Sequence, residues 1–492
     1  MIDTEVDRPH VVLVVPRGES VRTFLYSETL GSLAEGARVT LLSVIDDEKF
    51  TTHFRSSCDG LIPLRYHPEH RFVSYLRMIT DTAHDRWLWS EVAKNRCEIR
   101  RREAKGGTAR LKRMVLEGVS RGFAFRRGLE FLTGLERSAN WALRPTGDFE
   151  ALWAELKPDL VFNCSHVHGP AGELPLKAAH RMGIPTAGFI FSWDNLTSRS
   201  RIFVPYDHYL VWTDRMRDDL LRLYREVPPD RVFVTGTPQF DFHFKDEYHL
   251  SREELCRRIG IDPKRPFILY TTGVAKHFPE EHRHVESVIG LLGEIEPEAR
   301  PQLVVRTYVK GTSSEMLALA GRGYPDVVFP PVLWEEKWYT PQYEDLAIYT
   351  SLLRHTCLGI NAASTVSLEL MIHDKPIINL GFDPPGSHLP HVLRFARHID
   401  FDHFRPVAQS GATMVARSVD DMRAMLNQGL TRPWDGREAR KSFLRAMFGT
   451  SLDGRSGRRV AARLLDLARR GRTGPFEEAR VGQGGGGATI GV

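Results

Sequence analysis

The chain has 492 residues, of which 42% are hydrophobic and 26% charged, with a formal net charge of +5. This length exceeds a single hydrophobic core, so we expect two domains. No apolar run approaches the roughly 18 to 20 residues that span a bilayer, and the acidic N-terminus lacks the layout of a signal peptide, which predicts a cytoplasmic protein.

The first elements predict a parallel sheet. Residues 10–15 form a compact apolar run, typical of a buried parallel strand. A polar turn that contains Glu19 follows, and then a helix near residues 21–35 and a strand at 39–44. This order of strand, helix and strand opens an α/β domain.

Residues 71–145 interrupt that pattern and predict a helical, basic insertion with a break at Gly106-Gly107. From Lys94 to Arg144 there are 14 Lys and Arg against five Glu, a net charge of +9. Basic helices bind anionic lipid, acidic substrates or nucleic acid, or they are simply solvated. No RNA- or DNA-binding module accompanies these charges, so we expect no nucleic-acid partner.

The alternation of strands and helices resumes at residue 158 and completes a first domain over residues 1–245. A strand at 158–163 is followed by a loop with His166 and His168, a helix at 173–182 and a strand at 186–191. Strands at 208–212 and 231–235 flank a helix at 214–226.

A second domain is predicted over residues 246–436. After a helix at 252–259, its strands are expected at 266–271, 302–306 and near 327–329, with a helix near 280–295. C-terminal helices follow over residues 437–470. The segment 437–472 holds 11 basic residues against three acidic ones, and the glycine-rich residues 471–492 are predicted to be disordered.

The most informative stretch runs from Leu358 to Leu380. It predicts a short buried strand, a turn of small residues, a helix and a second strand. Ser364 and Thr365 are placed to cap the helix and leave its first amides free, which suits a phosphate. Glu369, one turn further on, is placed to accept hydrogen bonds from a ribose. The alternative is an ordinary crossover helix with a serine cap.

The same order of features occurs in the first half of the chain. A strand ends in Asn163, then come a polar loop, a helix and a proline that starts the next strand, as they do after Asn361. The repetition predicts two parallel-sheet domains that face each other, with a ligand cleft at the carboxyl ends of their strands.

Three stretches of the sequence resemble the GT-B superfamily. They are residues 167–169 with 176–185, residues 234–241, and residues 363–369 with 375–377. This superfamily includes many glycosyltransferases, the non-hydrolysing UDP-N-acetylglucosamine 2-epimerases and the CDP-glycerol glycerophosphotransferase group. The resemblance implies an α/β, GT-B fold: two facing Rossmann-like parallel-sheet domains, with the helical insertion in the first.

The resemblance also implies a nucleotide site. Ser364 and Thr365 would contact the diphosphate of a sugar nucleotide, and Glu369 would contact its ribose. The full nucleotide-binding set that we expect is Ser364, Thr365, Ser367, Glu369, Arg306, Thr272 and Gly273. In this fold, helix dipoles and basic side chains usually stabilise the leaving diphosphate in place of a metal. We therefore expect no metal and no cofactor besides the donor substrate.

The catalytic base should come from the first domain. His168 is the leading candidate because imidazole titrates near neutral pH. Asp194, Glu173 and His166 are further candidates, and for each the alternative is a structural role such as loop capping. For the acceptor we expect contacts from Glu19 and from Trp193, whose ring is suited to stack on a sugar.

Departures from the family patterns bear on the activity. Arg306 is followed by Thr307-Tyr308-Val309, where capsule and teichoic-acid members carry Arg-Pro-His-Pro, which argues against a glycerophosphotransferase mechanism. Pro170 stands where the epimerases have an acidic residue, and residues 190–193 replace a His-Glu-Ala-Gly-like run. These departures favour a glycosyltransferase over an epimerase.

We therefore predict a metal-independent glycosyltransferase that transfers a sugar from a nucleotide-sugar donor to a glycan or lipid-linked acceptor, in surface polysaccharide or glycolipid biosynthesis. Its basic helices would rest on the anionic inner face of a membrane. The alternatives are a UDP-sugar 2-epimerase-like enzyme or a polyol-phosphate transferase of the same fold. An alternative of another class is a non-catalytic nucleotide-sugar-binding or scaffold protein.

Overall fold

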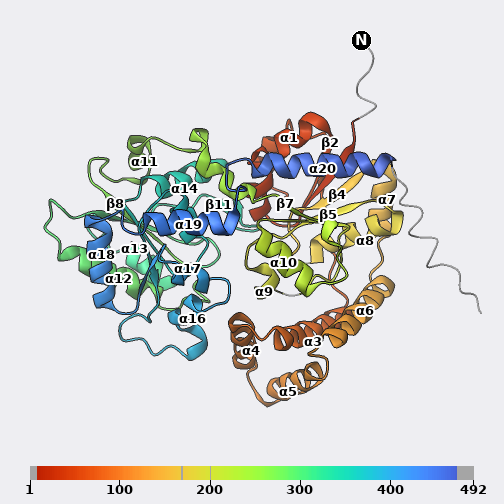
Figure 1. The fold of residues 1–492 in the computed structure, drawn as a ribbon, viewed down its shortest axis with the longest axis horizontal. Coiled ribbons are helices and arrows are strands. Elements are labelled where there is room, and N and C mark those ends of the chain that lie inside the picture. The colour runs from red at the N-terminus through yellow and green to blue at the C-terminus, as the bar shows by residue number, and fades with distance from the viewer. Residues whose placement is uncertain (1–7, 168–169, 200, 474–492) are drawn as a thin grey trace, which may run out of the picture.

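Two parallel β-sheets, one in each half of the chain, form the framework of the molecule (Figure 1). The computed structural model describes residues 8–167, 170–199 and 201–473. Helices cover the sheets, and the two halves lie side by side. The prediction of two facing Rossmann-like parallel-sheet domains, with a helical insertion in the first, is confirmed.

The first sheet has seven strands among the described residues, in the order β3-β2-β1-β4-β5-β6-β7. The inner strand β1 pairs in parallel with both neighbours, so that Val12 lies opposite Thr40 on one side and Val161 on the other. Strands buried on both faces are mostly apolar, and β1 is apolar from Val11 to Val15. The strands are β1 His10–Val15, β2 Arg38–Ser43, β3 Gly60–Pro63, β4 Leu160–Asn163, β5 Thr186–Phe189, β6 His208–Val211 and β7 Val232–Val234.

The helix predicted near residues 21–35 is split in two. A π-helix occupies Val21–Leu25, and α1 begins at Glu28 because the Ser27 hydroxyl accepts a hydrogen bond from the Thr29 amide at 3.2 Å. The helices around the first sheet are α1 Glu28–Gly36, α2 Glu48–Phe54, α7 Gly147–Leu156, α8 Glu173–Met182, α9 Asn195–Ser198 and α10 Asp214–Leu223.

The insertion consists of four long helices among the described residues: α3 Arg71–Leu88, α4 Glu91–Glu103, α5 Gly107–Arg121 and α6 Arg126–Leu143. They form an arc beside the first domain (Figure 1). The arc has a small core of its own, made by Ile79, Ala83, Leu116, Leu129 and Leu132. At its base, buried Arg77 pairs with Glu136 at 2.7 Å and with Glu173 of α8 at 2.9 Å. These ion pairs fix the insertion to the first domain.

The second sheet has six strands in the described part of the chain, in the order β10-β9-β8-β13-β14-β15. Gly359 of β13 lies opposite Leu269 and Ile377, and a Cβ atom there would come within 2.2 Å of the Leu370 side chain. Only glycine lets the next helix pack so close to the sheet. The strands are β8 Phe267–Thr271, β9 Gln302–Arg306, β10 Val327–Val328, β13 Leu358–Asn361, β14 Ile377–Leu380 and β15 Met414–Ala416, and a separate pair is β11 Trp334–Glu335 with β12 Thr340–Pro341.

Helices cover the second sheet as well. Helix α15 begins at Val366 and ends at Ile372. It is therefore shorter than the sequence of the stretch from Leu358 to Leu380 suggests. The helices of this half are α11 Arg252–Ile259, α12 Glu281–Gly293, α13 Ser314–Ala320, α14 Tyr343–His355, α15 Val366–Ile372, α16 Phe395–Ile399, α17 Arg405–Gln409, α18 Val419–Thr431 and α19 Arg437–Phe448.

The C-terminal helix α20, Ser456–Thr473, returns to the first domain and lies across α1 (Figure 1). The Asp241 carboxylate, in the segment that joins the halves, accepts hydrogen bonds from the amides of Ser456 and Gly457 at 3.0 and 2.7 Å. Residues 471–473, which we predicted to be disordered, continue this helix, and the rest of the predicted disordered tail lies outside the described residues. In the described part of the chain, every helix is too short or too polar to cross a membrane.

Candidate functional site

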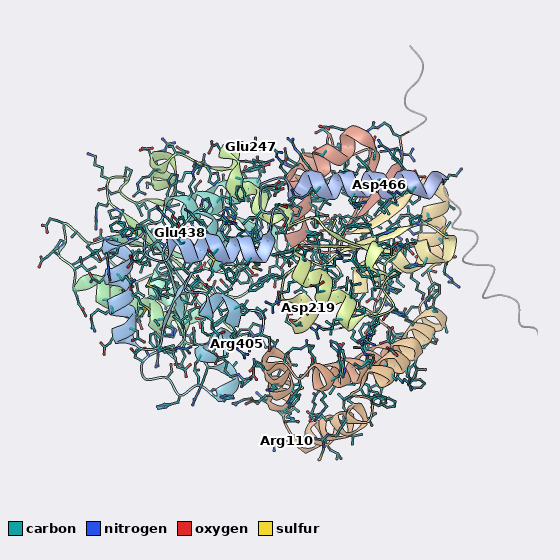
Figure 2. The ribbon with its side chains drawn as sticks, viewed as in Figure 1. Arg110, Asp219, Glu247, Arg405, Glu438 and Asp466 are labelled. Atoms are coloured by element: carbon teal, nitrogen blue, oxygen red, sulfur yellow. The ribbon has the colours of Figure 1, made fainter. Side chains whose placement is uncertain are left out.

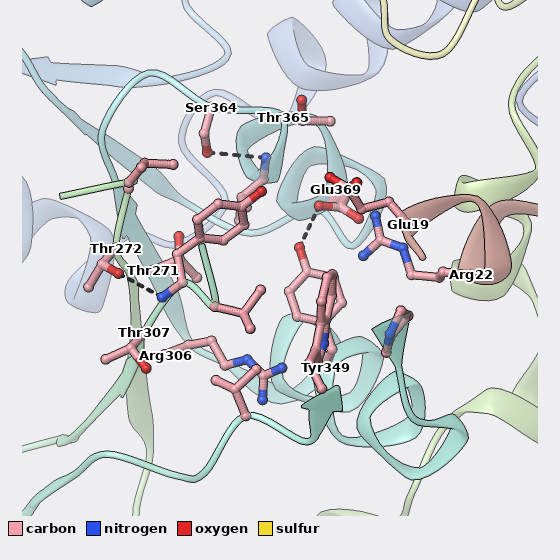
Figure 3. A pocket seen from close by; sticks show the side chains of 18 of the residues that line it. Glu19, Arg22, Thr271, Thr272, Arg306, Thr307, Tyr349, Ser364, Thr365 and Glu369 are labelled. Atoms are coloured by element: carbon pink, nitrogen blue, oxygen red, sulfur yellow. Dashed lines mark hydrogen bonds between the residues drawn. The ribbon is translucent and has the colours of Figure 1, made fainter. Parts of the chain in front are cut away.

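A cavity of about 380 Å³ lies between the two halves, at the carboxyl ends of β8, β9 and β13 (Figure 3). Open α/β sheets bind ligands at this edge of the sheet. Of the predicted nucleotide-binding and acceptor residues, the structure brings seven to the cavity lining: Glu19, Thr272, Gly273, Arg306, Ser364, Thr365 and Glu369.

The loop between β13 and α15 forms one wall. The Ser364 hydroxyl accepts a hydrogen bond from the Val366 amide at 3.3 Å and donates one to the Asn361 side chain at 3.2 Å. Ser364 therefore bonds the first amide of α15, while the N-cap position belongs to Thr365. The next two amides bond to the carbonyl oxygens of Ser364 and Thr365, so the prediction that the first amides of this helix are free for a phosphate is wrong. The Thr365 hydroxyl does not cap the helix, because it accepts a hydrogen bond from the Trp193 indole at 3.2 Å. Trp193 belongs to the first domain, so this bond joins the two walls.

Ser367 lies under this wall and does not line the cavity. Its side chain is fully buried and bonds to Asn361 at 3.1 Å and to Asn379 at 2.9 Å. Asn361 also accepts a hydrogen bond from Asn379, so one amide oxygen ties the β13–α15 loop to β14. The structure thus gives Ser367 a supporting position beneath the loop.

Arg306 ends β9 and reaches the opposite wall. One of its guanidinium nitrogens donates to both oxygens of Asp345, at 2.8 and 2.6 Å. The other terminal nitrogen, Nη1, is buried and has no hydrogen-bond partner among the described residues. Because an unpaired buried donor is costly, this nitrogen is available to a ligand that carries an acceptor oxygen.

The turn after β8 supplies Thr272 and Gly273. The Gly273 amide donates to Glu281 at 2.9 Å, and the Tyr270 hydroxyl donates to the same carboxyl group at 3.3 Å. Burial raises the pKa of Glu281 to about 8, against the effect of these two hydrogen bonds. A Cβ atom on Gly273 would come within 2.1 Å of the Phe278 ring, so glycine is required in this turn.

Glu369 lies on the cavity wall of α15. Its carboxylate accepts a hydrogen bond from Tyr349 at 2.5 Å (Figure 3) and a second one from His243 at 3.4 Å. Burial opposes ionisation, but the interactions with His243, Tyr349 and the nearby Arg22 outweigh it and hold the pKa of Glu369 below its ordinary value. Glu369 is therefore a charged acceptor at neutral pH.

The first domain contributes Glu19 and Arg22 to the cavity. Glu19 pairs with Arg17 at 3.0 Å and also with Lys310 of the second domain. The Arg22 guanidinium lies 5.8 Å from the ring centre of Tyr349. Arg22 and Arg306 thus place two guanidinium groups around one space, a suitable environment for a diphosphate.

The predicted catalytic bases lie away from this cavity or outside the described residues. Burial lowers the pKa of His166 to about 4, and its ring bonds to the backbone of Phe189 and Phe191. Glu173 pairs with Arg77 and Arg144, both at 2.9 Å. His168 lies outside the described residues.

Asp194 holds a turn together. Its carboxylate accepts hydrogen bonds from the hydroxyls of Ser192, at 2.6 Å, and Ser198. Burial opposes its charge, but His403 and these hydroxyls keep its pKa below the ordinary value. None of the described residues among the predicted bases lines the cavity.

Trp193 marks the boundary between this cavity and a second one. The second cavity, of about 600 Å³, lies between the insertion, α10 and the segment around His403. Its wall includes Trp89, Trp193, Asp219, Asp402 and His403. The Trp193 indole meets the His403 ring edge-on at 5.2 Å. The predicted acceptor residue Trp193 therefore lines a separate space next to the site of Thr365.

Several residues of the cavity lining were not predicted from the sequence. Arg22 carried a weak signal, since it follows a polar turn after the first strand. Asp345 and Tyr349 carried none, because they lie within α14, which has no motif and reaches the cavity only through the packing of the second domain.

Comparisons with known proteins bear on the fold. No protein-family profile matches the chain, and no curated protein sequence matches it. Among solved structures, a UDP-N-acetylglucosamine 2-epimerase matches with a TM-score of 0.52 and 14% identity, covering 93% of this chain and 95% of that one. The UDP-GlcNAc 2-epimerase from Neisseria meningitidis, bound to UDP-GlcNAc, matches with a TM-score of 0.52 and 11% identity, covering 93% and 100%. The chain has the GT-B fold, as the sequence predicted.

Proposed function

We propose that the chain is a GT-B glycosyltransferase that holds a nucleotide-sugar donor in the cavity between its two sheets. The observation that carries this proposal is the convergence of Arg22, Arg306, Thr365 and Glu369 on one space of about 380 Å³. This volume suits a small ligand. The structurally similar Neisseria enzyme is bound to UDP-GlcNAc, which supports a nucleotide sugar as the ligand class.

Different residues of the cavity would bind different parts of the donor. Arg22 and the free nitrogen of Arg306 would stabilise the negative charge that grows on the leaving diphosphate. The hydroxyls of Thr272 and Thr365 would donate hydrogen bonds to the phosphate oxygens, with Ser364 beside them in the cavity wall. Glu369, charged and already oriented by Tyr349, would accept hydrogen bonds from the ribose.

For proton transfer we propose Glu19. It is the carboxylate that the first domain contributes to the cavity lining among the described residues, and carboxylates serve as general bases in such reactions. It would take the proton of the acceptor hydroxyl as that oxygen attacks the sugar. Lys310 and Arg17 fix its orientation. Glu19→Gln should lower kcat, whereas Glu35→Gln, on the exposed side of α1, should leave it unchanged.

The acceptor would enter through the second cavity. Trp193 and Trp89 offer aromatic faces on which a sugar ring can stack, and the hydrogen bond from Trp193 to Thr365 places this space beside the donor site. This arrangement fits a glycan or lipid-linked acceptor in surface polysaccharide or glycolipid biosynthesis.

The insertion would hold the enzyme at the anionic inner face of a membrane. On α5 the side chains of Leu111, Met114, Val115 and Val119 share one face and are 57%, 66%, 52% and 43% exposed. Arg110, at the outer end of the arc, begins this face (Figure 2). The insertion also carries exposed cations that have no ion pair among the described residues: Arg102, Lys105, Arg110, Lys112, Arg121 and Arg127.

A helix that combines an exposed apolar stripe with basic residues binds anionic bilayers. The C-terminal basic segment differs, because α20 packs on the first domain and its arginines pair with acidic residues such as Glu28 and Asp466. We therefore assign membrane contact to α5 and α6 and not to α20.

Vesicle sedimentation tests this assignment. The chain should bind vesicles of phosphatidylcholine mixed with phosphatidylglycerol, and salt should weaken the binding. The double variant Leu111→Glu, Met114→Glu should lose it. Leu317→Glu, at an equally exposed position on α13, should keep it. Equal binding by both variants would contradict the assignment.

A thermal-shift screen with UDP-, GDP-, CDP- and dTDP-sugars tests the donor proposal. A stabilising shift by one nucleotide class is expected. Arg22→Ala should remove the shift, and Arg417→Ala, exposed on another surface, should not. No shift with any of these donors would contradict both an enzyme and a binding protein for nucleotide sugars.

An epimerase is the second candidate, because the similar solved structures are UDP-GlcNAc 2-epimerases. Product analysis separates the two. Release of free nucleotide from the donor supports a transferase, and interconversion of the sugar without release supports an epimerase. Transfer of a polyol phosphate would release a nucleoside monophosphate and is distinguished in the same assay.

A further inference from the structure

Three histidines gather beside Glu369, whose carboxylate contacts one of them, His243. His243 belongs to the segment Pro238–Phe244 that joins the two halves, His249 follows it, and His373 comes directly after α15. One ring nitrogen of each lies within 4.8 Å of the others. The proposed function uses none of these three side chains.

The outer ring nitrogens of two of the histidines are already engaged. Nδ1 of His249 lies 2.9 Å from the carbonyl oxygen of Lys245, and Nε2 of His243 lies 3.4 Å from the Glu369 carboxylate. Both oxygens accept hydrogen bonds, so these nitrogens carry the protons. The remaining nitrogens, Nε2 of His249 and Nδ1 of His243, therefore present lone pairs.

The lone pair on Nδ1 of His243 lies next to the ring of His373. Nε2 of His373 lies 3.1 Å from Nδ1 of His243. Two nitrogens bound to one tetrahedral zinc ion at about 2.0–2.1 Å are roughly 3.3 Å apart, so this spacing suits two ligands of one ion. Nε2 of His249 is buried and has no hydrogen-bond partner among the described residues. A network of hydrogen bonds alone leaves that nitrogen unsatisfied.

We propose that His243, His249 and His373 bind a divalent transition-metal ion, Zn²⁺ in the first instance. In such sites, the ring nitrogen that does not bind the metal usually donates to a carboxylate or a backbone carbonyl, which fixes the orientation of the ring. Here the Glu369 carboxylate and the Lys245 carbonyl hold the rings of His243 and His249 in this way. His249 and His373 are half-buried, which leaves a path for the ion and a position for a water ligand. The nearby cation Arg354 is paired with Asp246 at 2.7 Å.

The ion would join the connecting segment to α15 and fix the orientation of His243 against Glu369. It lies outside the cavity lining, because none of the three histidines contributes to that lining. The metal would therefore take no direct part in sugar transfer, and it would support the geometry of Glu369 and of the connection between the domains.

Metal analysis of the tag-free full-length chain tests this proposal. After incubation with Zn²⁺ and gel filtration, the wild-type chain should retain one zinc per chain. His249→Gln and His373→Gln should each weaken Zn²⁺ binding about tenfold or more. His391→Gln is the matched control, since His391 is 61% exposed and lies apart from the cluster.

Cobalt provides a second measurement on the folded protein. Co²⁺ bound by three histidines and a water should give the intense visible absorption of a tetrahedral site in the wild-type chain and in His391→Gln, but not in His249→Gln. If the wild-type chain retains no zinc, or if His249→Gln and His391→Gln retain equal amounts, the site is overturned. Neither result bears on nucleotide-sugar binding, which is measured separately.

Discussion

The loops after β4 and after β13 follow the same plan but serve different ends. Asn163 ends β4 and bonds to the Tyr206 hydroxyl at 2.9 Å, whereas Asn361 ends β13 and orients Ser364 and Ser367. The helix after β4 directs Glu173 toward the arginines of the insertion, while the helix after β13 directs Glu369 into the cavity. What packs against each loop, more than its sequence pattern, decides its role.

Removing Arg77 should produce the largest effect and should leave the cavity intact. Arg77→Ala deprives the fully buried Glu136 of its cation, and breaking such a pair costs about 3–5 kcal/mol. Urea denaturation measures the loss. Arg257→Ala, which breaks only an exposed pair with Glu254, should change stability by less than about 1 kcal/mol. If nucleotide binding by folded Arg77→Ala also falls strongly, the contrast between the two loops is wrong.

The second domain contains, besides its buried ion pair Arg306–Asp345, a buried carboxyl group that stays neutral, that of Glu281. Because burial raises the pKa of Glu281 to about 8, the folded protein holds this proton over a range in which the unfolded chain has lost it. The stability that this group contributes is complete below its unfolded pKa, near 4.5, and is lost as the pH rises toward 8, by about 1.4 kcal/mol per unit at most.

Glu281→Gln removes this dependence. The variant should gain stability relative to the wild type as the pH rises from 5 to 8, and thermal unfolding at a series of pH values measures the gain. Glu280→Gln, at the neighbouring position outside the buried network, should follow the wild-type curve. Parallel curves for wild type and Glu281→Gln would show that Glu281 is ionised at neutral pH.

Glu369→Gln tests, at the cavity, the difference between the loops after β4 and after β13. The amide keeps the size of the side chain but loses the charge and one acceptor oxygen, so nucleotide affinity should fall about ten- to a hundredfold, with little change in stability. Calorimetric titration of the donor identified in the screen measures the change. Glu173→Gln should leave the affinity unchanged, and an equal loss in both variants would remove the ribose assignment of Glu369.

Trp193→Phe should have the smallest effect. It removes the hydrogen bond from the indole to Thr365, which is worth about 0.5–1.5 kcal/mol. Donor affinity should fall only a few-fold, while the apparent affinity for the acceptor should fall further because the second cavity loses part of its wall. Trp434→Phe, at an exposed position, is the control and should change neither affinity.

Much of the fold was predictable because local patterns decide it. The apolar runs of β1, β8 and β9 and the turn residues around α8 and α11 predicted these elements closely. The repeated plan of Asn163 and Asn361 predicted two facing sheets. The loop of Ser364 and Thr365 also reached the cavity as expected.

The rest depended on tertiary packing that no local pattern records. Tyr349 and Asp345 reach the cavity from within α14, and the three histidines come from separate segments. The charge pattern also did not distinguish the two basic segments of the sequence. In the structure, arginines of α20 pair with acidic residues, whereas α5 exposes cations beside apolar side chains. Such differences arise only when distant segments meet.

The most direct test of the account is a structure of the chain with the bound donor that the screen identifies. We predict that the diphosphate lies between Arg22, Arg306 and Thr365, with the ribose against Glu369, in the cavity at the ends of β8, β9 and β13. A nucleotide bound instead in the second cavity, beside Trp89 and His403, would contradict it.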